Sequence, residues 1–91
     1  MRVVSLDGSR LADEAAFWRE YLVAVQPDGA EYFGRNLAAF RDAVTSGGPG
    51  WPGKQCRLRI VGHADAGVGA AFLAKLAGIA DETSAFELEL A

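Results

Sequence analysis

Two stretches of the sequence alternate apolar with charged residues, which is the pattern of a strand with one buried face. Residues 56–61 alternate apolar with basic side chains, and residues 86–90 alternate apolar with acidic ones. Residues 2–6 have the composition of a third short strand, and the turn pair Asp7-Gly8 closes it. The pattern therefore predicts three strands, one at each end of the chain and one in its middle.

Between these strands, apolar residues recur at helical spacing in three stretches. The first begins after Asp13, a good helix N-cap, and ends at residues 27–29. The second covers residues 36–45, with Asn36 as its N-cap, and the third runs from Gly67 to about Ala80. The expected apolar faces are, in chain order, Leu11, Ala15, Trp18, Leu22 and Val25, with Phe17 and Tyr21 beside them; then Leu37, Phe40 and Val44; then Val68, Phe72, Leu76 and Ile79.

The order strand, helix, helix, strand, helix, strand favours a parallel sheet, because crossovers between parallel strands are right-handed. The alternation predicts that helices cover one sheet face and water the other, a two-layer α/β domain spanning residues 1–91. If the second and third strands are neighbours, Arg57 and Arg59 would oppose Glu87 and Glu89 on the open face.

Composition excludes several classes of protein. The 91 residues are 51% hydrophobic and carry a formal net charge of -3, which is typical of one globular domain and a poor match for nucleic-acid binding. A single cysteine and a single histidine argue against disulfides and Cys/His metal sites, and we expect no cofactor or metal. The early charges and the lack of a long apolar run favour a cytoplasmic protein with no membrane partner.

A glycine-rich turn is the main hint of an enzyme or nucleotide binder. Gly62, Gly67 and Gly69 precede a helix, as in the opening of a dinucleotide-binding motif, and His63 lies among them. Phe72 stands where the third glycine of that motif would be, so a packed helix start is the favoured interpretation. Cys56 falls on the apolar phase of its strand, which predicts a buried, inert thiol.

The stretch from Tyr32 to Thr45 is the most typical of a binding surface. An aromatic loop, in which Gly34 is expected to adopt a positive φ, leads into a capped helix whose outward stripe presents Asp42. An exposed aromatic beside a fixed carboxylate suits a partner with a cationic pocket. An ordinary amphipathic helix with a solvated polar stripe is the alternative at this point.

This stretch resembles the signature of the barstar family, the intracellular inhibitors of secreted microbial ribonucleases. Length and element order fit as well, so the resemblance covers the whole chain. It implies a two-layer barstar-like fold in which a helix and its preceding loop plug a ribonuclease active site. Nine positions match the signature, with Val44 as a conservative exchange: Tyr32, Phe33, Gly34, Asn36, Leu37, Ala39, Phe40, Asp42 and Thr45.

The resemblance also assigns roles to residues. It implies that Asp42 occupies the position of a substrate phosphate, that Tyr32 packs against the nuclease, and that Asn36 and Thr45 edge the contact. The expected partner is a ribonuclease or nuclease toxin, bound by an immunity-type protein that is not an enzyme and is a monomer when free. The full set of expected partner-binding positions is Tyr32, Gly34, Asn36, Ala38, Arg41, Asp42 and Thr45.

Several positions depart from the family pattern. Ala38 replaces an aspartate, Arg41 and Gly47 replace tryptophans, and Gly78 stands near the position of a glutamate. The family's third helix is expected to shrink to a turn. Residues 35–61 carry a net charge of +4, the wrong sign for steering toward a strongly basic nuclease. These departures keep a second hypothesis open, an interaction or regulatory module of the same fold that does not inhibit ribonucleases.

Overall fold

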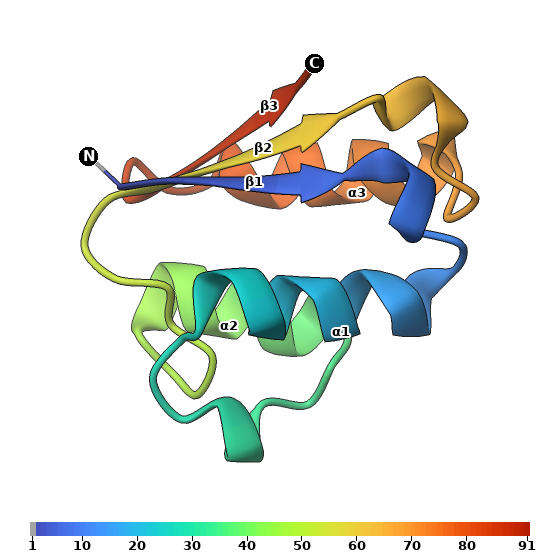
Figure 1. Cartoon of the computed structure of the whole chain (residues 1–91). Helices are drawn as coiled ribbons and strands as arrows, with labels where there is room; N and C mark the ends of the chain where they lie inside the picture. The colour runs from blue at the N-terminus through green and yellow to red at the C-terminus, as the bar shows by residue number, and fades with distance from the viewer. Residues whose placement is uncertain (1) are drawn as a thin grey trace.

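A computed structural model describes residues 2–91, in which three parallel strands form one sheet (Figure 1). The strands are β1 (Arg2–Asp7), β2 (Cys56–Val61) and β3 (Phe86–Leu90), and β2 lies in the centre. Both pairings are parallel, as the crossover argument predicts.

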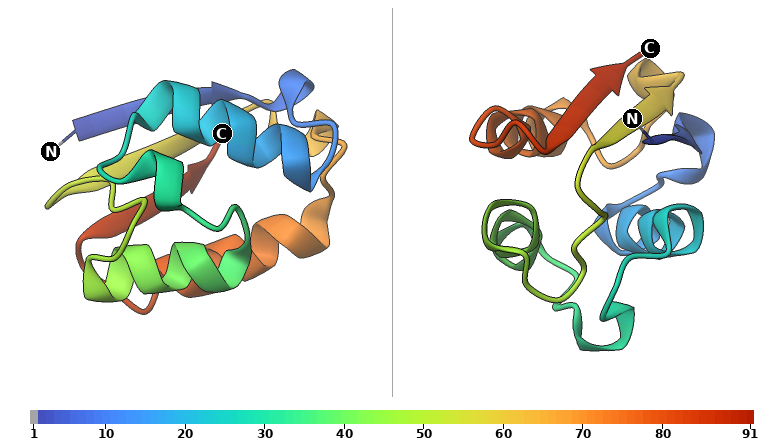
Figure 2. Two further views of the ribbon diagram at one scale, coloured as in Figure 1. Left: turned by 90° about the horizontal axis from the view of Figure 1, so that it is seen from below. Right: turned by 90° about the vertical axis from the view of Figure 1, so that its left-hand side faces the viewer.

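Three α-helices lie on one side of this sheet (Figures 1 and 2). α1 packs against β1, while α3 contacts both β3 and α2. α1 and α2 lie below the sheet in Figure 1 and in the right-hand view of Figure 2, which shows them side by side. The fold is therefore the two-layer α/β arrangement expected from the sequence. The α-helices are α1 (Glu14–Val25), α2 (Leu37–Ser46) and α3 (Ala70–Ala80), and three short 3-10 turns are η1 (Gly8–Arg10), η2 (Ala30–Tyr32) and η3 (His63–Asp65). The turn η3 occupies the place where the sequence predicted a helix reduced to a turn.

The open face of the sheet carries the predicted charge pairs. Arg57 is in register with Glu87, and Arg59 with Glu89. The guanidinium of Arg57 lies 2.9 Å from Glu87 and 3.7 Å from Glu89, and that of Arg59 lies 2.8 Å from Glu89. Opposite charges on neighbouring strands thus fix the same register that burial of the other face requires.

Aromatic side chains form the centre of the core and join α1 to the other elements. Trp18 of α1 lies 5.6 Å from Phe40 of α2 and 5.9 Å from Phe72 of α3, measured between ring centroids. Phe40 in turn lies 5.1 Å from Phe86 at the start of β3. These contacts fix α2 against the rest of the molecule, although α2 makes few contacts with the sheet itself.

The expected apolar face of α1 is wrong in part. Ala15 is exposed and Leu22 is only half-buried, whereas Ala16, Phe17 and Tyr21 are buried. The large rings of α1 take the inward positions because they bury the most apolar area, and this rotates the buried face away from the spacing of the smaller residues.

The third helix begins at Ala70 and not at Gly67, which corrects the expected boundary. Gly67 packs so closely on the η1–α1 connection that a Cβ added to it would lie 2.5 Å from the carbonyl oxygen of Ala12. The Val68 amide donates to the carbonyl of Leu11 at 2.8 Å, so this segment is paired with another part of the chain. Leu73 of α3 is buried, while Phe72 of α3 and Val68, which precedes the helix, are half-buried and pack against the core.

No helix in the described part of the chain is long and apolar enough to cross a membrane.

Candidate functional site

The loop before α2 and the first turn of α2 are held together by one side chain. The Asn36 side-chain oxygen accepts a hydrogen bond from the Ala39 amide at 2.7 Å, as expected for an N-cap. Its amide nitrogen donates to the Gly34 carbonyl at 3.2 Å. The direction of the helix and the position of the loop are therefore coupled.

The positive φ expected at Gly34 falls instead on Arg35, which has φ of 54°. Gly34 is instead in close contact with α2, since a Cβ at this position would lie 3.1 Å from the Cβ of Ala39. The loop approaches the first turn of α2 closely at Gly34, and the left-handed residue follows it. The expectation for the glycine is corrected, and its presence is explained by close packing.

Of the two aromatic residues in this loop, Phe33 lies in the core and Tyr32 lies in solvent. Phe33 is buried and touches Trp18, whereas Tyr32 is 76% exposed. A second loop supports Phe33, since a Cβ added to Gly50 would lie 2.4 Å from its ring. The sequence analysis did not predict this support, because Gly50 and Phe33 lie in different loops and no local pattern connects them.

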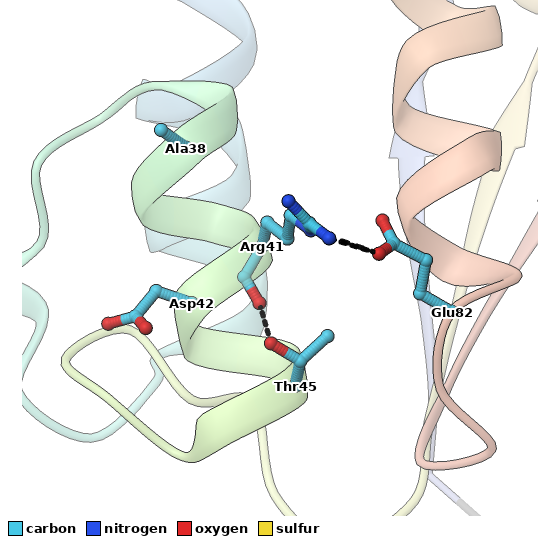
Figure 3. A pocket seen from close by; sticks show the side chains of 5 residues that line it. All are labelled: Ala38, Arg41, Asp42, Thr45 and Glu82. Atoms are coloured by element: carbon cyan, nitrogen blue, oxygen red, sulfur yellow. Dashed lines mark hydrogen bonds and ion pairs between the residues drawn. The ribbon is translucent and has the colours of Figure 1, made fainter.

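Four predicted site residues line one outward face of α2 (Figure 3). Ala38, Arg41, Asp42 and Thr45 are exposed, and together with Glu82 they line an open groove of about 480 Å³, here called the α2–α3 groove. Their spacing of three, four and seven residues places them on the same side of the helix. The structure thus brings these four together with one residue that sequence reasoning missed.

Glu82 is the missed residue, and it holds Arg41. It lies between the end of α3 and the start of β3. Its carboxylate oxygen Oε1 accepts hydrogen bonds from Arg41 Nη2 at 2.6 Å and Nε at 3.0 Å. A pair separated by 41 positions leaves no local pattern, so only the packing of α2 on α3 reveals it.

Asp42 is not tied to the arginine beside it. Figure 3 shows its carboxylate pointing away from Arg41, toward the loop that follows α2. It lies beside Gly48, whose added Cβ would be 2.9 Å from Asp42 Oδ2. Among residues 2–91 it takes part in no ion pair. An exposed and unneutralised carboxylate therefore stands on the surface of α2.

Thr45 is bound within its own helix. Its hydroxyl donates to the carbonyl of Arg41 at 2.6 Å (Figure 3). The hydroxyl oxygen can still accept a hydrogen bond from outside. Gly47 ends the helix in the left-handed conformation, with φ of 75°, and its amide donates to the Ala43 carbonyl at 3.0 Å. Both ends of α2 are thus capped.

The glycines near His63 have structural uses. Gly62 and Gly69 adopt positive φ of 70° and 92°, and Gly67 packs on Ala12. His63 Nδ1 lies 3.0 Å from the carbonyl oxygen of Ala91. These contacts favour the structural interpretation of this turn over a nucleotide site.

Cys56 is a buried free thiol, as predicted. Desolvation of the thiolate raises the pKa of Cys56, which keeps the group protonated and unreactive.

Comparison with known proteins adds a finding that is independent of the structure. A comparison with curated proteins finds no match. A family model described as "Barstar (barnase inhibitor)" matches residues 1–87 of the 91-residue chain. Because this match spans nearly the whole sequence, the chain belongs to the barstar family.

Proposed function

We propose that this protein inhibits a ribonuclease by placing Asp42 where a phosphate of the RNA substrate would bind. One observation carries the proposal: the Asp42 carboxylate is exposed, and no cation within residues 2–91 pairs with it. A ribonuclease must hold the anionic phosphate among hydrogen-bond donors and cations, and a carboxylate can take the same donors.

The rigidity of α2 supports this role. Caps at Asn36 and Gly47 fix both helix ends, and Phe40 anchors the buried side of α2 among aromatic rings. Little conformational freedom then remains to be lost when the helix enters an active site, and this favours tight binding. A carboxylate in the phosphate position offers no bond for the enzyme to cleave, so the complex is a blocked enzyme.

Tyr32 and Asn36 extend the proposed contact along the loop. Tyr32 supplies a large exposed aromatic surface next to α2, a side-chain type that often contributes strongly to binding. The proposed contact residues are Tyr32, Gly34, Asn36, Ala38, Arg41, Asp42 and Thr45. The proposed partner is a ribonuclease or nuclease toxin, bound in the cytoplasm by an immunity-type protein that is a monomer when free.

The test is inhibition of purified secreted ribonucleases and of nucleases encoded beside this gene, with Asp42→Asn as the diagnostic variant. This exchange removes the charge and keeps the shape. We expect inhibition by the original protein and a loss of about 2–5 kcal/mol of binding free energy in the variant. Asp65→Asn, in η3, is the matched control with the same change of charge. Inhibition that is unaffected by Asp42→Asn would contradict phosphate mimicry.

Ala38 and Arg41 favour a second candidate, an interaction or regulatory module that does not inhibit ribonucleases. Ala38 offers no charge to a cationic cleft, and Arg41 brings a positive one. If this candidate is correct, proteins captured by the purified chain will include no nuclease, and no ribonuclease in the panel will be inhibited.

A further inference from the structure

Arg41 is the one cation among the residues that line the α2–α3 groove. It is adjacent in sequence to Asp42, so the two Cα atoms are about 3.8 Å apart. An enzyme that covers the α2–α3 groove and grips Asp42 with several cations therefore also lies beside the Arg41 side chain, which is 62% exposed. Like charges placed this close in an interface oppose binding.

Pairing with Glu82 adds to the effect of Arg41 on the charge of the groove. Glu82 Oε1 accepts hydrogen bonds from Arg41 Nε and Nη2, so the two charges offset each other and Glu82 adds no free negative charge beside Asp42. The pair still reaches solvent, because the side chain of Arg41 is 62% exposed and that of Glu82 is 39% exposed. A partner docking on this face therefore meets one unpaired carboxylate, Asp42, beside an exposed ion pair whose arginine cancels the second carboxylate.

We propose that Arg41, held by Glu82, is a specificity-determining residue that excludes ribonucleases whose active-site cleft is uniformly cationic. This inference rests on the proposed function of Asp42. The cognate ribonuclease then has a cation-poor border beside its phosphate pocket, on the side that faces α3. The truncated side chain of Ala38, one turn before Arg41, adds no negative charge that would offset the guanidinium.

The test is a gain of binding to barnase, used as a probe of the strongly basic class. Arg41→Gln removes the guanidinium and frees Glu82, so the groove changes from one unpaired carboxylate to two. We expect Arg41→Gln to bind barnase at least about tenfold more tightly than the original protein, measured by calorimetry or surface plasmon resonance. Arg19→Gln, on the exposed face of α1, makes the same change in net charge outside the groove and is expected to shift the affinity by less than about twofold.

Glu82→Gln is the reciprocal variant. It leaves Arg41 without its partner, and we expect it to bind barnase more weakly than the original protein. Thermal unfolding of each variant checks that the fold is retained, which is expected because the Arg41–Glu82 pair is exposed and such pairs contribute about 0–1 kcal/mol.

The inference is overturned if Arg41→Gln binds barnase no more tightly than Arg19→Gln, including the case in which neither binds. Adding Asp42→Asn to Arg41→Gln separates the two proposals. If the double variant binds barnase as tightly as Arg41→Gln, Asp42 contributes nothing to the contact, and phosphate mimicry fails while the role of Arg41 stands. If no gain occurs but another ribonuclease is inhibited through Asp42, the role of Arg41 fails and the proposed function stands.

Discussion

At the scale of single residues, Asn36 controls the start of α2 through two hydrogen bonds. Asn36→Ala removes the acceptor of the Ala39 amide, at 2.7 Å, and the donor to Gly34, at 3.2 Å. We expect a loss of about 1 kcal/mol in the free energy of unfolding, measured by urea denaturation. Asn36→Asp keeps the capping oxygen and is expected to retain most of this stability. Equal losses in the two variants would show that the cap is not the cause.

Alanine substitutions at Gly50 and Gly53 distinguish the cost of backbone strain from the cost of a steric clash. Both have positive φ, 94° and 109°, but an added Cβ meets the Phe33 ring at 2.4 Å only at Gly50. Gly53→Ala should cost about 1–3 kcal/mol through strain alone. Gly50→Ala should cost at least about 1 kcal/mol more, because Phe33 must move. Thermal unfolding measures both, and equal destabilisation would mean that the second loop does not support Phe33.

The surface residues of α2 could be predicted from sequence because helical spacing alone places them on one face. Asn36 was likewise predictable, since capping depends on neighbours within three residues. Glu82 and the close contact of Gly50 with Phe33 were not, because each depends on segments far apart in the chain. The positive φ moved from Gly34 to Arg35 because packing against Ala39, which local preference does not contain, fixed the loop.

At the scale of elements, the strands were the easiest part to predict. A period of two determines which face each residue occupies, and opposite charges on β2 and β3 select their register. The buried faces of the helices were harder to predict. More than half of the surface of α1 is apolar, so several faces fit the spacing of apolar residues. The start of α3 was misplaced because Val68 is hydrogen-bonded to Leu11 and Gly67 packs on Ala12, both in the connection before α1.

The charge pairs on the open face of the sheet select the register of β2 and β3 and add little to the free energy of unfolding. We expect a double-mutant cycle of Arg59→Gln and Glu89→Gln to give a coupling of about 0.2–1 kcal/mol, because the pair lies at 2.8 Å on an exposed face. The coupling should nearly vanish in about 1 M salt, where screening shortens the Debye length to about 3 Å. A coupling that is unchanged by salt would indicate that the pair acts through packing.

At the scale of the whole molecule, the charged contact proposed at Asp42 makes partner binding dependent on salt. Asp42 is expected to sit among the cations of the enzyme, so the association rate should fall as sodium chloride rises from about 0.05 to 0.5 M. Stopped-flow measurements on an inhibited ribonuclease would show this, and Asp42→Asn should flatten the dependence. A dissociation constant that does not change with salt would argue against a charged contact at Asp42.

The core also makes the fold sensitive to alkaline pH. Burial raises the pKa of Tyr21 far above its usual value, with the neighbouring Cys56 adding to the effect, and burial raises the pKa of Cys56 itself. The unfolded chain loses these protons near pH 10 and 8.5, about the values of free side chains, while the folded chain keeps them. The folded state therefore binds more protons in this range, and stability falls as pH rises.

We accordingly expect Tyr21 and Cys56 to leave the free energy of unfolding unchanged below about pH 8. Above that pH the free energy of unfolding should fall progressively, and more steeply beyond about pH 10. Tyr21→Phe removes the ionisable hydroxyl and its 3.4 Å hydrogen bond to the Gly50 carbonyl but keeps the ring among Phe17, Trp18 and Phe40. This variant should be slightly less stable than the original protein at neutral pH and should lose less stability above pH 10, as measured by urea denaturation at a series of pH values. Tyr32→Phe is the control for loss of a surface hydroxyl. Parallel pH profiles for the original protein and Tyr21→Phe would mean that ionisation of the buried phenol does not govern alkaline unfolding.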